Sequence, residues 1–169
     1  NVAGAHPAGG IGIRHDAATH LVPRILKAAC GKRPVFKIFG DDYSTPDGTC
    51  IRDFIYVVDL CDAHLCALRA LRRGIKNEIF NLGNGDGFSV KIVLAVSEAV
   101  VGRKIPAQTA KRRAGDPAKI VASSRKAQRI LKWKPRTPLN EIIRTAWQWE
   151  LKKKKGSHPF SKKQITGKD

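Results

Sequence analysis

The sequence predicts an α/β fold, and three observations support this. Short apolar segments typical of strands alternate with longer segments of helical periodicity. A chain of 169 residues with 42% hydrophobic content can bury one sizeable core and is too short to need two. No internal repeat and no second domain linker divides the chain. We therefore expect one α/β unit.

The first expected elements are a helix and a strand. Apolar residues recur at helical spacing over residues 19–31, with Pro23 in the first turn and Gly31 at the end. Residues 35–39 are a short apolar segment, which predicts a strand. Residues 41–49 contain the turn sequence Pro-Asp-Gly and therefore predict a loop.

A second strand is expected over residues 51–58, and a helix after it. Asp59 has a side chain suited to an N-cap, and Gly74 is suited to end the helix. The residues of this helix that we expect to face the core are Leu60, Ala63, Ala67, Leu68 and Leu71.

A third strand is expected over residues 78–82, with the glycine-rich residues 83–87 as the turn that follows. This glycine-rich segment lacks the Lys-Ser/Thr pair of a phosphate-binding loop, so we interpret it as a tight strand-to-helix connection. Ser89 is an expected N-cap, and the helix after it should stop near Gly102.

The C-terminal part is expected to contain an extended segment, two helices and a tail. Residues 105–110 should be extended, and Ser124 can cap a helix. Thr137 and Pro138 suit the N-cap and first turn of the last helix. Residues 151–169 are Lys-rich and polar, which predicts a disordered tail.

The charge of the chain raises nucleic acid as a partner. Its 32 Lys and Arg against 14 Asp and Glu give a formal charge of +18, and clustered cations attract phosphate backbones. The Lys and Arg residues are spread over residues 69–76, 111–113, 125–136 and 152–155, and no RNA motif, zinc finger or basic zipper accompanies them. We therefore favour a solvated surface over a nucleic-acid partner.

The cysteines and apolar segments indicate a soluble cytoplasmic protein without a metal. The four cysteines show no Cys-x-x-Cys spacing, and we expect buried free thiols. Cys61 and His64 could share a helix face, but a zinc site needs about four ligands. The longest apolar stretches, residues 54–58 and 92–101, are shorter than a membrane span, and no secretory signal is present.

Four motifs occur in an informative order. Residues 38–59, IFGDDYSTPDGTCIRDFIYVVD, place two strand-like segments around a polar, turn-rich loop. The other three are NVAGA at residues 1–5, FNLGNG at 80–85 and RRAGD at 112–116. Together the four motifs resemble the UDP-glucose 4-epimerase family of the extended short-chain dehydrogenase/reductase superfamily.

The resemblance implies a Rossmann-type sheet with a small mixed α/β substrate domain. The family's Gly-rich dinucleotide turn and Tyr-x-x-x-Lys pair are absent from these 169 residues. Residues 1–150 would therefore be the C-terminal, UDP-sugar-binding portion, and residues 151–169 a basic tail. The resemblance also implies that the strands over 51–58 and 80–82 would join the sheet of a missing N-terminal NAD-binding half. We expect the chain alone to be inactive and to associate through its unpaired strand edges.

The resemblance further implies an activity. The complete enzyme would interconvert UDP-glucose and UDP-galactose through a 4-keto intermediate with bound NAD, while this chain holds the UDP. Expected partners are UDP-glucose or UDP-galactose, the missing N-terminal half and, in the complete enzyme, a second copy in a homodimer. NAD is not expected to bind this chain alone.

Two arginines are candidates for binding a diphosphate, because a guanidinium stays charged and offers a planar fork of donors. Arg52 could instead form an ion pair with Asp53 or Asp59. The family's Arg-Asp-(Phe/Tyr)-Ile motif, whose Arg contacts the diphosphate, favours the ligand. The family's Arg-Arg-x-Gly-Asp motif implies that Arg113 binds the diphosphate and Asp116 the ribose, although alone this segment is typical of a solvated turn.

The remaining site residues are also implied by the resemblance. Asn1 would reach the substrate from the end of a strand, and a helix entry would border the diphosphate. The segment that meets the uracil ring contains a Phe that could equally be a core residue. The predicted substrate-binding residues are Asn1, His20, Leu21, Lys37, Phe39, Arg52, Arg113 and Asp116. We predict no catalytic, cofactor-binding or metal-binding residue within the chain.

Three alternatives remain open. The chain could belong to another nucleotide-sugar epimerase or dehydratase of the superfamily, because the sugar-facing residues lie mostly outside it. It could be a non-catalytic remnant. It could also be a basic nucleic-acid-binding module, which would show binding that depends steeply on salt.

Overall fold

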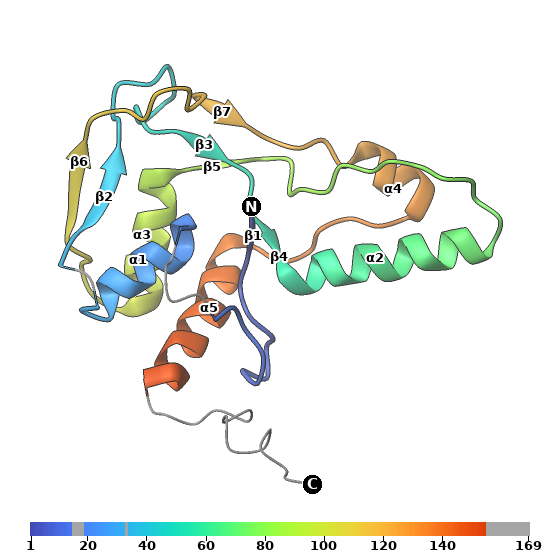
Figure 1. Ribbon diagram of the computed structural model, residues 1–169, viewed down its shortest axis with the longest axis horizontal. Helices are drawn as coiled ribbons and strands as arrows, with labels where there is room; N and C mark the ends of the chain where they lie inside the picture. Colours follow the sequence, from blue (N-terminus) through green and yellow to red (C-terminus); the bar gives the residue numbers. More distant parts are fainter. Residues whose placement is uncertain (15–18, 33, 155–169) are drawn as a thin grey trace, which may run out of the picture.

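The computed structural model describes residues 1–14, 19–32 and 34–154. Strands and helices alternate along the chain, which confirms the predicted α/β fold (Figure 1). In chain order the elements are β1 (Val2–Ala3), α1 (Leu21–Ala29), β2 (Phe36–Phe39), β3 (Ile51–Arg52), β4 (Ile55–Tyr56), α2 (Val57–Arg72), β5 (Phe88–Ser89), α3 (Val90–Val101), β6 (Ala107–Ala110), β7 (Lys119–Ile120), α4 (Arg125–Leu131) and α5 (Leu139–Lys154).

The strands pair in three small sheets, mostly in parallel. β1 pairs with β4, and β2 pairs with β6, with Val2 opposite Ile55 and Phe36 opposite Ala107. β3 lies between an antiparallel β5 and a parallel β7. Parallel neighbours need long crossover connections, and the helices lie in those connections.

The helices form two groups, each with its own core. α1, α3 and α5 pack together, and Ile25, Val93 and Ile142 are fully buried in the larger core. α2 and α4 extend from this lobe as an arm, at the right of Figure 1. They pack through a smaller core that includes Ala63 and Ala127.

The predicted helix ends are confirmed at several positions. Pro23 lies in the first turn of α1. The Ser89 hydroxyl accepts a hydrogen bond from the N–H of Ile92 at 3.1 Å, and Gly102 ends α3 with a φ of +78°. α5 runs to Lys154, four residues into the segment predicted as a disordered tail. Across the described residues, no helix has the length and apolar character needed to cross a membrane.

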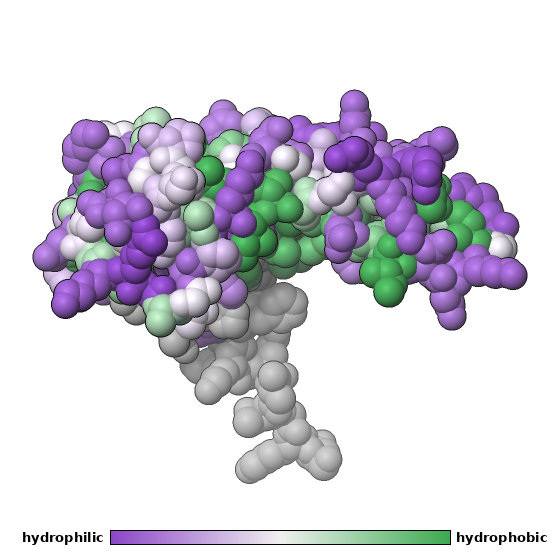
Figure 2. Space-filling model, turned by 90° about the horizontal axis from the view of Figure 1, so that it is seen from above, coloured by the Kyte–Doolittle hydropathy of each residue, from purple (hydrophilic) through white to green (hydrophobic). Residues whose placement is uncertain are grey.

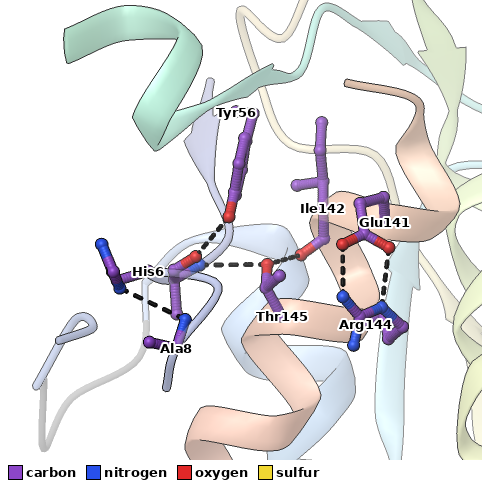
Figure 3. A network of polar contacts seen from close by, with 8 residues as sticks. His6, Ala8, Tyr56, Glu141, Ile142, Arg144 and Thr145 are labelled. Carbon is purple, nitrogen blue, oxygen red and sulfur yellow. Dashed lines mark hydrogen bonds and ion pairs between the residues drawn. The ribbon is translucent and has the colours of Figure 1, made fainter. Parts of the chain in front are cut away.

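A polar network fixes the chain that leaves β1 against α5 (Figure 3). The Tyr56 hydroxyl donates to the carbonyl of Ala5 at 2.6 Å, and the N–H of Ala5 donates to Oγ1 of Thr145 at 3.2 Å. The Thr145 hydroxyl donates to the carbonyl of Ile142 at 3.0 Å. Burial raises the pKa of Tyr56, so the phenol stays protonated as a donor near neutral pH.

The second predicted strand, over residues 51–58, is wrong in extent. The structure divides it into β3 and β4, and α2 begins at Val57. Periodicity alone does not separate a short apolar strand from the start of a buried helix, and here the helix begins within the apolar run.

Asp59 is not the N-cap of α2, because Tyr56 occupies that position. The Asp59 carboxylate instead accepts hydrogen bonds from the N–H groups of Arg136 and Thr137, both at 3.0 Å. The side chain therefore accepts from backbone donors just before α5, and Arg136, the first of them, is 77 residues away along the chain.

Two other sequence predictions for the arm are wrong. Leu68 and Leu71 are 54% and 52% exposed, because α2 carries apolar residues on two faces and only the face with Ala63 meets the core. The strand predicted over residues 78–82 does not form, and Ile79 is 85% exposed. A strand needs a hydrogen-bonded neighbour, and among the described residues none pairs with this segment.

Candidate functional site

A pocket of about 210 Å³ opens between the start of α1, the strands β2 and β3, and the segment before β7. The structure brings all the predicted substrate-binding residues to the lining of this one pocket. They are Asn1, His20, Leu21, Lys37, Phe39, Arg52, Arg113 and Asp116. Arg52 and Arg113 therefore share a single cavity although 61 positions separate them in the sequence.

Arg52 lies on β3 and is held at two points. Its Nη1 donates to the carbonyl of Ile51 at 2.7 Å, and its Nη2 forms an ion pair with the carboxylate of Asp116. The parallel pairing of β3 with β7 brings the segment of Asp116 beside it. A guanidinium has five N–H donors, so this arrangement leaves donors for a ligand.

The alternative partners proposed for Arg52 from the sequence, Asp53 and Asp59, are wrong. The Asp53 carboxylate accepts hydrogen bonds from the N–H groups of Asn84 at 2.7 Å, Gly85 at 3.1 Å and Ala122 at 3.2 Å. The glycine-rich segment therefore directs two of its N–H groups at a carboxylate rather than at an open pocket. This geometry supports a tight connection and not a phosphate-binding loop.

Arg113 stacks on the ring of Phe39, with 3.9 Å between the guanidinium carbon and the ring centroid. Phe39 and Lys37 are two positions apart on β2 and so lie on one face of the strand. Ile38, between them, is buried in the larger core. Phe39 is half-buried at the pocket wall and is not itself part of the buried core cluster.

Arg112, the neighbour of Arg113, has a different environment. It forms an ion pair with Asp42 and lies 4.0 Å from the centroid of the Tyr43 ring. It does not line the pocket. Of the two adjacent arginines, only the second faces the cavity, as the family motif implies.

The start of α1 forms one edge of the pocket. His20 occupies the N-cap position with extended backbone angles, and Leu21 is the first helical residue. The first N–H groups of a helix are open to anions because they have no partner within the helix. Asn1 lies across the cavity, where its Nδ2 donates to the carbonyl of Asp53 at 3.1 Å.

Arg24 also lines the pocket, and sequence reasoning missed it. Its guanidinium lies 5.5 Å from the centroid of the Phe39 ring, which Arg113 also contacts. The available signal was its spacing, because Arg24 follows His20 by one helical turn and so shares its face.

The charges of the pocket favour an anionic ligand. Among the described residues, four cations line it, Arg24, Lys37, Arg52 and Arg113, against one carboxylate, Asp116, which is paired with Arg52. Such a lining suits a diphosphate, for which planar, bidentate donors are the preferred protein groups.

No metal centre is found in the part of the chain that the structure describes. No group of three or more His, Cys, Asp or Glu side chains there could hold an ion. The four thiols are free, but the prediction that they are buried is confirmed only for Cys50. Cys61 is exposed, and the other two are half-buried.

Comparison with known proteins gives consistent matches. Residues 1–83 match the NAD dependent epimerase/dehydratase family. The UDP-glucose 4-epimerase of Halalkalibacterium halodurans is 50% identical over 162 residues, which cover 95% of this chain and 48% of that protein. The enzyme of the same name from Lacticaseibacillus casei is 51% identical over 150 residues, or 88% of this chain and 45% of that protein.

Solved structures agree. A crystal structure of a UDP-glucose 4-epimerase superposes with a TM-score of 0.89 at 50% identity, over 94% of this chain and 48% of that one. The Bifidobacterium longum enzyme in complex with NAD+ and UDP gives a TM-score of 0.85 at 35% identity, over 93% and 47%. The chain spans about half the length of the relatives that it matches. It therefore has the α/β fold of the extended short-chain dehydrogenase/reductase superfamily and is similar, along nearly all of its length, to about half of a UDP-glucose 4-epimerase.

Proposed function

We propose that this chain is the C-terminal, UDP-sugar-binding part of a UDP-glucose 4-epimerase. The observation that carries the proposal is the convergence of Arg52 and Arg113 on one cationic pocket. The solved relative that holds UDP, at 35% identity and a TM-score of 0.85, supports the choice of nucleotide.

In this proposal the guanidiniums of Arg52 and Arg113 both bind the diphosphate. Asp116 accepts from the ribose hydroxyls while it keeps Arg52 oriented. The N–H groups at the start of α1 add donors for a phosphate oxygen. Phe39 and Lys37 border the uracil, and Asn1 lies toward the sugar.

The chemistry at the sugar belongs to a partner segment. In the complete enzyme NAD would supply hydride transfer at C4 of the sugar. The 169 residues contain neither the Gly-rich dinucleotide turn nor a Tyr-x-x-x-Lys pair, so the chain does not fit NAD by itself. The contribution of this chain is to hold the nucleotide while the sugar rotates in the active site. This uses binding energy remote from the reaction to position the reacting centre.

The first test is UDP binding by the Arg113→Ala variant. One ionic hydrogen bond is worth about 1.5 to 3 kcal/mol, so affinity measured by calorimetry should fall about tenfold or more. Lys111→Ala is the matched control, because it removes one exposed charge from the same segment outside the pocket. Unchanged UDP affinity in Arg113→Ala would refute the assignment.

The second test addresses the missing half. The chain should epimerise UDP-glucose only when mixed with the N-terminal half of a homologous epimerase. Turnover by such mixtures would support a split or truncated enzyme, whereas inactivity of every mixture would favour the non-catalytic remnant. The homodimer of the complete enzyme stays a prediction, which sedimentation of the active mixture tests. A cytoplasmic location also stays a prediction, which fractionation of cells that express the chain tests.

The sugar specificity belongs to the same experiment. A solved relative with 42% identity and a TM-score of 0.75 is a UDP-Glc/GlcNAc 4-epimerase of Campylobacter jejuni. The active mixture should therefore be offered both UDP-glucose and UDP-N-acetylglucosamine. We propose the hexose as the substrate, and exclusive turnover of the N-acetylhexosamine would contradict this.

A further inference from the structure

A second group of cations lies on the α2–α4 arm, around a hollow of about 240 Å³. Arg69 comes from α2, and Lys132, Lys134 and Arg136 come from the segment between α4 and α5. This hollow shares no lining residue with the nucleotide pocket. The four cations that line the nucleotide pocket account for only a small part of the formal charge of +18.

The wall that carries three of these cations is fixed in place. Trp133 is buried, and its Nε1 donates to the carbonyl of Asp59 at 3.0 Å. The N–H of Arg136 donates to the carboxylate of Asp59. Lys132, Lys134 and Arg136 are exposed at alternate positions, and the residues between them are more buried. The fold therefore presents these three charges outward on one rigid strip.

The cations of the hollow are not neutralised by neighbouring carboxylates. Within residues 1–14, 19–32 and 34–154, Arg69 and the three strip cations form no ion pair. Asp59 is buried and occupied by two backbone N–H groups. Asp62 is the one other carboxylate in the described lining, so positive charge prevails.

The positive charge continues along both helices of the arm. Arg73 lies at the end of α2 on the face of Arg69, four positions later, and Arg125 and Arg129 are exposed on α4. The N–H of Arg136 is bonded to Asp59 near the start of α2, and Arg73 lies fourteen positions further along the helix, a distance of about 20 Å at about 1.5 Å per residue. Phosphates follow one another every 3.4 Å or so along each strand of a duplex, so the band is long enough for several of them. Figure 2 shows purple hydrophilic residues at this end of the molecule, at its right, interspersed with green hydrophobic ones.

We propose that this basic band, defined by Arg69, Lys132, Lys134 and Arg136, binds the phosphate backbone of a nucleic-acid duplex without reading its sequence. Single-strand sites rely on exposed aromatic rings for base stacking, and Trp133, the one aromatic residue in the described lining of the hollow, is buried. Backbone binding needs only an array of unpaired cations at phosphate spacing. The inference extends beyond the proposed function and does not depend on it.

The test is the salt dependence of binding to a fluorescent duplex of about 20 base pairs and arbitrary sequence. The slope of log affinity against log salt is about −0.9 per phosphate contacted. Four contacts should therefore weaken binding about a hundredfold between about 50 and 200 mM salt. The triple variant Arg69→Gln, Lys134→Gln, Arg136→Gln should reduce that loss to about fourfold and weaken binding at low salt.

The matched control is the triple variant Arg14→Gln, Lys111→Gln, Lys119→Gln, which removes three exposed charges elsewhere. Its slope should stay near that of the unchanged chain. Equal slopes in the two triple variants, or no duplex binding at low salt, would overturn the proposal. Retained UDP affinity in the band variant separates this result from a folding defect and from failure of the nucleotide site.

Two competitors distinguish the source of the negative charge. Polyglutamate and phosphatidylserine vesicles should bind more weakly than the duplex at equal charge. Equal or tighter binding of either, with the same sensitivity to the band variant, would contradict a nucleic-acid partner. A single strand of the same sequence that binds more tightly than the duplex would overturn the choice of duplex.

Discussion

Arg52 and Asp116 show what a motif predicts about single residues and what it leaves open. Both were expected at the nucleotide site from short sequence motifs, and both line the pocket. Their pairing across 64 positions could not be expected, because it depends on the register of β3 against β7. Asp53 was considered as a partner because it follows Arg52 in the sequence, but its carboxylate accepts a hydrogen bond from the backbone N–H of Asn84 instead.

Arg24 is the residue whose role the structure adds to the site. It is half-buried at the pocket, beside the ring on which Arg113 stacks. Replacing Arg24 with Ala should weaken UDP binding by about threefold to tenfold, the range of a partly exposed ionic contact. Binding of uridine, which lacks the diphosphate, should stay unchanged in the same titration. An equal loss for UDP and uridine would assign Arg24 to the fold or to the base.

At the scale of elements, periodicity identified the helices well and the strands poorly. α1, α3 and α5 were expected from apolar spacing and from their flanking Ser, Gly and Pro residues, which act locally. Strands depend on neighbours distant in sequence, so residues 78–82 read as a strand although the described chain provides no partner for them. α2 was expected as a helix, but it carries apolar residues on two faces, and the sequence does not indicate which face packs against the core.

Asp47 joins the loop before β3 to the start of α3. Its carboxylate accepts from the N–H of Thr49 at 2.9 Å, from the Thr49 hydroxyl at 2.7 Å and from the hydroxyl of Ser89. Burial acts to raise the pKa of Asp47, but these hydrogen bonds and the charge of Lys91 outweigh it and lower the pKa. The contact therefore favours the ionised carboxylate.

The lowered pKa of Asp47 predicts an acid dependence of stability. Its contribution is fully present above the unfolded-state pKa of about 3.9 and is lost as pH falls through the lower folded-state value. Urea midpoints measured below about pH 4 should therefore fall less steeply in Asp47→Asn than in the unchanged chain. Asp86→Asn, at an exposed position, should keep the original slope. Identical slopes for all three proteins would remove Asp47 as the cause.

At the scale of the whole molecule, α2 leaves an apolar face uncovered. Leu68 and Leu71, which do not line the basic hollow, are each about half exposed on α2, and the extended residues 78–82 lie unpaired among the described residues. Exposed apolar faces and unpaired extended segments promote association. Under the proposed function, we expect this surface to be covered by the half of the epimerase length that the chain does not span.

The chain alone should therefore form oligomers, and adding the N-terminal half of a homologous epimerase should disperse them. Light scattering with size exclusion would measure both effects. The double variant Leu68→Glu, Leu71→Glu should shift the isolated chain toward monomer, whereas Ile92→Glu, at an exposed position on α3, should not. A sharp two-state melt of soluble, unmodified monomer would contradict this prediction.

Asp53 has a further consequence for anyone who redesigns this protein. Its side chain holds the backbone at Asn84, Gly85 and Ala122, and its carbonyl accepts from Asn1. Because Arg52 immediately precedes it, an insertion in the glycine-rich segment would strain the ligand cavity as well as the connection. Gly10, whose surroundings are open and whose backbone is outside the left-handed region, is the safer point at which to graft a tag or a loop.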